Sequence, residues 1–256
     1  MSTTRADAWL TRLRAHQLGR LQLVCFSYAG GSASAYRTWA DDLPADVDMC
    51  AVQLPGRDNR LAERPFTRLR DLVEALADAL EPNLRAPFTF FGHSMGALVA
   101  FELMREFRRR GGPQPLQLFV SACRAPQLPD PDPPIHLLPE PALLEELRRL
   151  DGTPGEVFEN PELRSLVLPT LRADFSVCET YVHEPDEPLA ISISAFGGAA
   201  DNEVSQEQLE GWRTQTSASF GLRIFAGNHF YFLGPARTAF LSALSHDLGA
   251  LLDELR

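Results

Sequence analysis

The segment "FTFFGHSMGALVAFEL" (Phe88–Leu103) decides how this chain folds. Its first residues form an apolar run typical of a strand buried on both faces, and apolar residues recur at helical spacing after Met95. Gly92-His93-Ser94-Met95-Gly96 joins the two and matches the nucleophile elbow, a sharp strand-to-helix turn that exposes a serine. A five-residue GxSxG arises by chance in roughly one chain in ten of this size. The strand before it and the helix after it make it specific.

Strand and helix patterns alternate on both sides of this segment. Apolar runs predict strands at Leu21–Tyr28, Met49–Leu54, Phe88–Gly92, Leu116–Ala122, Ile191–Gly197 and Leu222–Gly227. Amphipathic patterns predict helices at Leu69–Leu80, Met95–Arg110 and in the C-terminal segment 236–255. This alternation predicts an α/β fold with a doubly wound, mostly parallel sheet. The length of 256 residues fits a single domain over 1–256.

One segment, from Ala125 to Pro188, breaks the alternation. It opens with the proline-rich "APQLPDPDPPIHLLPEP" and continues with two helical patterns, "ALLEELRRL" and "LRSLVLPTLRADFSVCETYVH". The helices offer apolar faces through Leu143, Leu144, Leu147, Leu166, Leu171 and Phe175. Such a length is too great for a plain connection between strands, and functional insertions gather at the sheet edge that holds the site. We therefore expect a lid at about 125–188; the alternative is a purely structural helical excursion.

The composition argues against a nucleic-acid partner and against a membrane span. The formal charge of −10 leaves no basic stripe for nucleic acid, and no segment approaches the length of a membrane span. The N-terminal residues lack the apolar core of a signal peptide. The four cysteines, Cys25, Cys50, Cys123 and Cys178, lie far apart, which favours reduced core residues of a cytoplasmic protein.

A nucleophilic serine needs a base, and the base needs an orienting acid. His229 lies just after the last predicted strand and Asp201 just after the preceding one. Because the carboxyl ends of parallel strands share one edge of a sheet, Ser94, Asp201 and His229 are expected to meet there. Their order along the chain is also the order expected for a fold with this elbow.

Other residues compete for these roles. Asp174 and Asp186 are rival acids, both within or beside the insertion. His16, His183 and His246 occupy amphipathic or loop contexts typical of surface residues, and His136 could line a lid. We expect His93, inside the elbow, to pack or form a hydrogen bond there.

The elbow also supplies an oxyanion donor, because the Met95 N–H opens a helix beside the serine. The glycine-rich "CFSYAGGSAS" after the first predicted strand suits a second donor, with Ala29 more plausible than Tyr28 and an ordinary turn as the alternative. No histidine–carboxylate cluster has metal-ligand spacing, and no GxGxxG or GxxxxGK[ST] occurs, so neither a metal nor a cofactor is expected.

Several motifs in order resemble the type II thioesterases, free-standing editing enzymes of polyketide and nonribosomal peptide assembly lines. They are "FSYAGGSASAYRTWADDLP", "VQLPGRDNRLAERPF", "FFGHSMGALVAFEL", "LRADFSVCETY", "FGGAADNEVSQEQLEGWRTQT" and "FAGNHFYF". Ser27 stands where proline is common in that family. The resemblance implies an α/β-hydrolase fold, a Ser94–His229–Asp201 triad, oxyanion donors at Ala29 and Met95, and an acyl chamber under the lid. It also implies substrates tethered by phosphopantetheine to carrier proteins.

Two classes of function remain open from the residues. The first is a thioester hydrolase acting as a cytoplasmic monomer on carrier-bound acyl groups, with an acyltransferase or an esterase using the same triad as the nearest alternatives. The second is a non-catalytic acyl-binding relative. The intact set of triad residues favours the enzyme.

Overall fold

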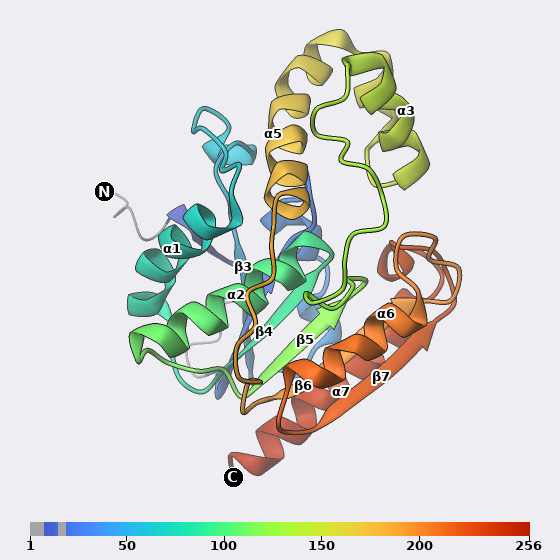
Figure 1. Cartoon of the computed structure of the whole chain (residues 1–256). Coiled ribbons are helices and arrows are strands. Elements are labelled where there is room, and N and C mark those ends of the chain that lie inside the picture. Colours follow the sequence, from blue (N-terminus) through green and yellow to red (C-terminus); the bar gives the residue numbers. More distant parts are fainter. Residues whose placement is uncertain (1–7, 15–18) are drawn as a thin grey trace.

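Seven strands form one sheet in the computed structural model, which describes residues 8–14 and 19–256 (Figure 1). The order is β1-β3-β2-β4-β5-β6-β7, and all neighbouring strands are parallel except β1 and β3. The strands are β1 (Leu10–Arg12), β2 (Leu21–Phe26), β3 (Val47–Val52), β4 (Phe88–His93), β5 (Gln117–Ser121), β6 (Ser192–Gly198) and β7 (Phe220–Phe225). The mostly parallel sheet of an α/β-hydrolase fold is confirmed.

The helices alternate with these strands as the sequence predicts. α1 (Leu69–Leu80) and α2 (Met95–Arg110) have the predicted bounds, and α7 (Arg237–Glu254) ends the fold. Between β6 and β7 lies the short α6 (Gln206–Glu210). Single 3₁₀ turns occupy Ala33–Tyr36, Ala40–Asp42, Asp58–Arg60, Glu81–Asn83, Gly211–Gln215 and Tyr231–Leu233.

Two apolar cores cover the two faces of the sheet. Helices α1 and α2 pack on one face, where Phe90 of β4 is buried, and α7 packs on the other, where the next residue, Phe91, is buried. Successive side chains of a strand point to opposite faces, so a strand covered on both sides must be apolar throughout. This explains why the β2 and β4 runs could be recognised from their composition.

The structure differs from the sequence prediction at both sheet edges. The edge strand β1 was not predicted: only three residues pair with β3, antiparallel, too few for a periodic signal. The other edge strand, β7, lies two residues earlier than the predicted Leu222–Gly227, and all of its residues are half-buried or exposed. It has a neighbouring strand on one side only.

Three helices fill the segment between β5 and β6: α3 (Glu140–Leu150), α4 (Gly155–Glu159) and α5 (Pro161–Glu179). They stand together beyond the end of the sheet, with α5 above α2 (Figure 1). Their buried side chains form a separate cluster made of Leu143, Leu144, Leu147, Leu168 and Leu171. One expectation was wrong, because Leu166 is 50% exposed. From the proline-rich stretch, Ile135 and Leu138 pack against this cluster.

Within the described part of the chain, none of the helices combines the length and the apolar character that crossing a membrane requires.

Candidate active site

Ser94 stands at the junction between β4 and α2. Its backbone has φ 52° and ψ −121°, a region that residues with a side chain rarely occupy. The strain persists because the turn is fixed on both sides: the Ser94 N–H donates to the Ser121 carbonyl at 2.8 Å, and the Ser94 carbonyl accepts from the Ala97 N–H at 2.9 Å. The hydroxyl is thereby presented at the carboxyl end of the strand.

The two glycines of the elbow are required by close backbone approaches. A Cβ at Gly96 would collide with the carbonyl oxygen of Phe26 at the end of β2, and one at Gly92 would collide with the backbone of Gly96. Helix α2 can therefore start directly against the neighbouring strand only if both positions lack a side chain. The elbow thus has the context that its sequence predicts.

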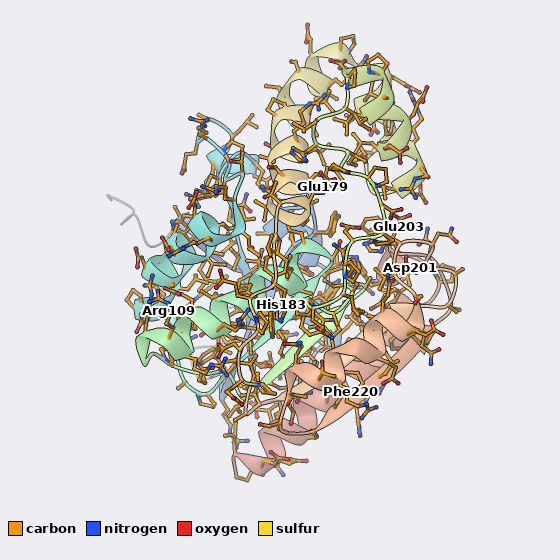
Figure 2. The ribbon with its side chains drawn as sticks, in the orientation of Figure 1. Arg109, Glu179, His183, Asp201, Glu203 and Phe220 are labelled. Carbon is orange, nitrogen blue, oxygen red and sulfur yellow. The ribbon has the colours of Figure 1, made fainter. Side chains whose placement is uncertain are left out.

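The loops after β6 and β7 bring an acid and a base together. The Nδ1 atom of His229 lies 3.0 Å from Oδ2 of Asp201, whose side chain is 1% exposed. The other carboxylate oxygen of Asp201 accepts from the N–H groups of Glu203 (2.9 Å) and Val204 (3.2 Å). With both oxygens occupied, Asp201 is fixed in place and holds the His229 ring. Asp201 and Glu203 lie next to each other below the end of α5 that carries Glu179 (Figure 2).

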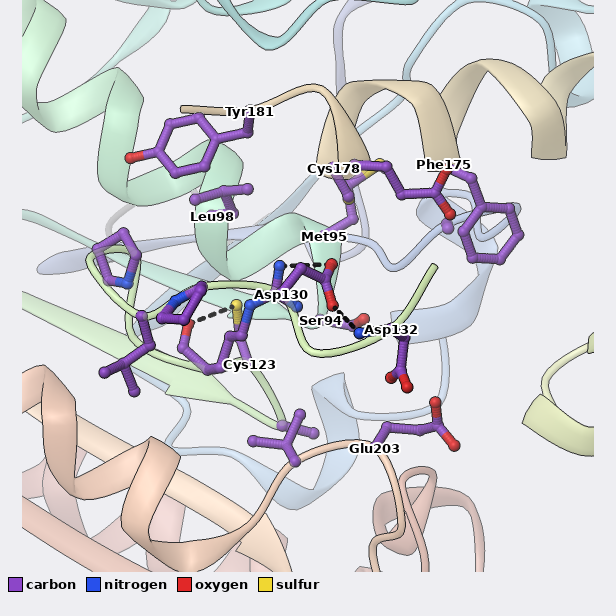
Figure 3. Close-up of a pocket in the computed structure, with 18 of the residues that line it drawn as sticks. Ser94, Met95, Leu98, Cys123, Asp130, Asp132, Phe175, Cys178, Tyr181 and Glu203 are labelled. Atoms are coloured by element: carbon purple, nitrogen blue, oxygen red, sulfur yellow. Dashed lines mark hydrogen bonds and ion pairs between the residues drawn. The ribbon is translucent and has the colours of Figure 1, made fainter. Parts of the chain in front are cut away.

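Ser94 and His229 line the same cavity, of about 470 Å³. Its wall also includes Ala29, Met95 and Leu98. Figure 3 shows Phe175 and Cys178 on one side of Ser94 and Glu203 on the other. Among the described residues no hydrogen bond joins the Ser94 hydroxyl to His229. Such catalytic hydrogen bonds are often long before substrate binds, so the arrangement is compatible with proton transfer.

The two rival acids have other partners. Asp174 is buried in α5 and forms a bidentate ion pair with Arg57. Nη1 of Arg57 donates to Oδ2 of Asp174 at 2.8 Å, and Nη2 donates to Oδ1 at 2.7 Å. Asp186 lies at the surface and pairs with Arg108. Of these three carboxylates, only Asp201 contacts His229 in the described part of the chain.

The two residues expected to be oxyanion donors, Ala29 and Met95, both line the cavity. Met95 is the first residue of α2, so its N–H has no acceptor within the helix. In the loop after β2, the Gly30 N–H donates to Asp174 and the Gly31 N–H to the Tyr28 carbonyl. None of the described residues accepts a hydrogen bond from the Ala29 N–H, and Ala29 lines the cavity.

His93 is fully buried beneath the elbow and forms a hydrogen bond there, as expected. Its Nδ1 lies 2.8 Å from the Ser121 hydroxyl, which lies 2.6 Å from the Tyr231 hydroxyl. Tyr231 follows His229 by two residues, so this chain of contacts ties the His229 segment to β4 and β5. Burial, reinforced by the neighbouring His229, holds the pKa of His93 well below its usual 6.5.

The burial of His93 predicts a loss of stability in mild acid. Below pH 6.5 the unfolded chain binds a proton at this residue that the folded chain does not bind. The contribution of neutral, buried His93 to the free energy of unfolding is therefore fully present above pH 6.5 and is lost as the pH falls below 6.5. In urea titrations at about pH 7.5 and 5.5, we expect the free energy of unfolding to fall by about 1.4 kcal/mol more in the wild type than in His93→Gln.

A surface histidine provides the control for this measurement. His246 is exposed on α7, so His246→Gln should keep the pH dependence of the wild type. Equal pH dependence in the wild type and in His93→Gln would show that His93 is not held neutral in the folded state.

The remaining histidines occupy different environments. His246 is exposed as predicted, whereas His183 is half-buried and lines the cavity instead of lying on the surface. His136 in the proline-rich stretch pairs with Glu179 of α5. His16 lies outside the described residues. Across residues 8–14 and 19–256, no three histidine, cysteine or carboxylate side chains are grouped so that they could hold a metal ion.

Two cysteines line the cavity wall, a position that the sequence does not predict. Cys123 follows β5 and Cys178 lies on α5. Burial raises the pKa of the Cys123 thiol to about 12 and that of Cys178 well above its ordinary value. The thiolate is the reactive form of cysteine, so both side chains are poor nucleophiles near neutral pH.

Sequence reasoning also missed the role of Asp174 and Arg57. A signal was present: Asp174 follows Thr170 by four residues and Leu171 by three, and precedes Val177 by three, so it shares their buried helix face. A carboxylate on a buried face requires a partner. Which of the 24 arginines it would meet could not be read from the sequence.

Residues 21–248 match the thioesterase domain family. The chain is 44% identical over 228 residues to the gramicidin S biosynthesis protein GrsT of Aneurinibacillus migulanus, covering 89% of each chain. The RedJ thioesterase of the prodiginine pathway in Streptomyces coelicolor superposes with a TM-score of 0.85 at 44% identity, over 90% of this chain and 91% of RedJ. The type II thioesterase BorB of the borrelidin biosynthetic cluster gives a TM-score of 0.85 at 38% identity, over 99% and 100% of the two chains. This chain therefore belongs to the thioesterase family.

Proposed function

We propose that the protein hydrolyses acyl thioesters on the phosphopantetheine arms of carrier proteins, using Ser94 as nucleophile, His229 as base and Asp201 as the orienting acid. It would act as an editing enzyme that removes stalled or aberrant acyl groups in polyketide or nonribosomal peptide biosynthesis, as a cytoplasmic monomer. Its similarity to type II thioesterases of such pathways supports the reaction class. The single observation that best supports the residues is the 3.0 Å contact between His229 and Asp201, beside Ser94 at the same cavity.

The proposed chemistry has two stages. Nε2 of His229 takes the proton of the Ser94 hydroxyl while Oγ attacks the thioester carbonyl carbon. Collapse of the tetrahedral intermediate breaks the carbon–sulfur bond, and the departing thiolate receives the proton from His229. A water molecule then attacks the acyl-serine with His229 again as base, releasing the carboxylic acid and restoring Ser94. The products are one acid and one thiol for each water consumed.

Two N–H groups are proposed to stabilise the negative oxygen that forms in both stages. The Met95 N–H lies at the start of α2, where the helix dipole favours negative charge. We take the Ala29 N–H as the second donor, because Ala29 lines the cavity and the N–H groups of the two residues that follow it, Gly30 and Gly31, already have acceptors. Donors fixed in advance need no reorganisation as the charge develops, which is why such groups contribute strongly to catalysis.

The residues of the lid segment support an acyl chamber within one domain spanning 1–256. Phe175 of α5 and Leu98 of α2 contribute apolar wall to the cavity. A cavity of about 470 Å³ falls in the range of small-molecule sites. Burial of each methylene of an acyl chain there would contribute about 0.8 kcal/mol to binding. We therefore propose that the segment 125–188 covers and sizes this chamber.

Hydrolysis of a panel of acyl carriers tests the proposed function. Carrier proteins loaded with acetyl, butyryl, hexanoyl, octanoyl or aminoacyl phosphopantetheine are incubated with the enzyme, and free thiol and free acid are quantified. We expect both products in equal amounts, at rates that depend on the acyl group. Matched oxygen esters and added amine or alcohol acceptors serve as the comparison.

Each alternative gives a different result in the same assay. Faster cleavage of the oxygen esters than of the thioesters would indicate an esterase. Acyl groups recovered on the added acceptor would indicate an acyltransferase, and acyl binding without turnover would indicate a non-catalytic relative.

A further inference from the structure

The lid helix α5 contacts the loop that carries Ala29 through one buried carboxylate. Oδ2 of Asp174 accepts the Gly30 N–H at 2.7 Å, and the Asp174 side chain is only 3% exposed. The same helix places Leu171 directly against Gly30, where a Cβ would meet the leucine side chain at 2.5 Å. Residues more than a hundred positions apart thus form one contact between the lid and the loop at the cavity.

The Tyr28–Gly31 loop is a tight turn with one defined form. The Gly31 N–H donates to the Tyr28 carbonyl at 2.9 Å, and Gly30 has φ 76°. This φ is the conformation that the third residue of a type II turn requires. Type I and type II turns differ by rotation of the central peptide, here the one joining Ala29 to Gly30. Asp174 accepts the N–H of that peptide, so it binds only the type II form.

Arg57 completes the contact from the loop after β3. It holds both oxygens of Asp174 and also donates to the Gly31 carbonyl at 2.9 Å. Its side chain is 6% exposed. Arg57 therefore fixes the end of the turn directly and its centre through Asp174. It also neutralises a carboxylate whose unbalanced charge would oppose a negative oxygen forming next to Ala29.

We propose that Asp174 and Arg57 are positioning residues that hold the Tyr28–Gly31 loop in the form in which Ala29 can act as an oxyanion donor. The contact of α5 with this loop is then required for transition-state stabilisation. The proposal rests on the proposed role of the Ala29 N–H as an oxyanion donor. It gives the lid a second task besides covering the chamber. Without these contacts from Asp174 and Arg57, the Gly30 N–H and the Gly31 carbonyl would lose their partners, and the turn that carries the Ala29 N–H would no longer be held in one form.

The test compares two changes on the same face of α5. Asp174→Asn keeps the size of the side chain but removes its charge and one of its acceptor oxygens. Thr170→Val is the matched control, because the Thr170 hydroxyl links the same helix to the loop after β3 by donating to the Gly56 carbonyl at 2.6 Å, and no hydrogen bond joins Thr170 to residues 28–31. Both variants are assayed for cleavage of hexanoyl-pantetheine. Their affinities for a hexanoyl trifluoromethyl ketone, which forms a tetrahedral adduct, and for the unreactive hexanoyl-pantetheine amide are also measured.

We expect Asp174→Asn to lower kcat by about 10- to 100-fold, less than the loss that follows complete removal of an oxyanion donor. The affinity for the trifluoromethyl ketone should fall by a similar factor, and the affinity for the amide should stay within about twofold. Thr170→Val should leave kcat within about twofold, even where it lowers thermal stability. Equal losses in the two variants, or equal weakening of the ketone and the amide in Asp174→Asn, would overturn the positioning role.

A second variant covers the case in which Asp174→Asn does not fold. Arg57→Lys keeps the positive charge but cannot bind both carboxylate oxygens and the Gly31 carbonyl together, so it should show the same selective loss for the ketone. Ser94→Ala is assayed in parallel. Activity that survives in Ser94→Ala would remove the proposed function, whereas wild-type kcat in the folded positioning variants beside an inactive Ser94→Ala would remove only this inference.

Discussion

Replacing Ser94 with alanine is expected to lower kcat by roughly 10⁴- to 10⁶-fold, the size of loss seen when the nucleophile of a triad is removed. The residual rate would come from binding and from the oxyanion donors alone. The fold should be kept, because the change removes one oxygen atom and leaves the Cβ in the same strained turn. The release of thiol from hexanoyl-pantetheine, with the thermal midpoint of each protein, measures both effects.

An exposed serine provides the control for this change. Ser165 lies on the surface of α5, and among the described residues its hydroxyl donates only to the Glu162 carbonyl, so Ser165→Ala should retain wild-type kcat. A folded Ser94→Ala protein that keeps more than about a tenth of the wild-type rate would contradict nucleophilic catalysis by Ser94.

Replacing Asp201 with asparagine is expected to produce the second largest effect, a loss of about 10³- to 10⁴-fold in kcat. The amide nitrogen would donate to Nδ1 of His229, which the carboxylate now holds at 3.0 Å. The imidazole would then carry its proton on Nε2 and could not accept the Ser94 proton. The measurement is kcat with hexanoyl-pantetheine, alongside circular dichroism to establish that the fold is intact.

Two further carboxylates serve as comparisons, and both are expected to lose less activity than Asp201→Asn. Asp186→Asn, at the surface beside Arg108, should leave kcat within about twofold, since such pairs contribute little. Asp174→Asn should fall between the two, because Asp174 contacts the Tyr28–Gly31 turn rather than His229. If Asp174→Asn is more damaging than Asp201→Asn in well-folded protein, Asp201 is not the triad acid.

The parts of the fold that could be predicted depend on local patterns. β4 begins with a mostly apolar run, α2 has apolar residues at helical spacing, and the elbow between them is set by residues 92–96 alone. β1 and α4 could not be predicted, because three and five residues are too few to show a period. The existence of the insertion followed from its length, but its packing depended on contacts between distant residues.

The same distinction applies to the candidate site. Asp201 and His229 could be chosen because strand ends of a parallel sheet share one edge, so topology alone brings them close. The contact of Asp174 with Arg57 and Gly30 joins three elements with no common pattern, and only the folded chain brings them together. The pKa shifts of His93 and of the two cavity cysteines could not be predicted either. They arise from desolvation in the folded chain, which the sequence does not reveal.

Mapping of the acyl-enzyme intermediate is the most direct test of whether Ser94 is the nucleophile. The enzyme is mixed with excess hexanoyl-pantetheine, quenched in acid within its first turnovers and digested with trypsin. Cleavage after Arg85 and Arg105 gives a peptide, residues 86–105, that contains Ser94 but no cysteine, whereas Cys123 and Cys178 fall in two other peptides. We expect the hexanoyl mass on the peptide 86–105, with fragment ions that place it on Ser94. A hexanoyl group on Cys123 or Cys178, with the peptide 86–105 unmodified, would contradict it.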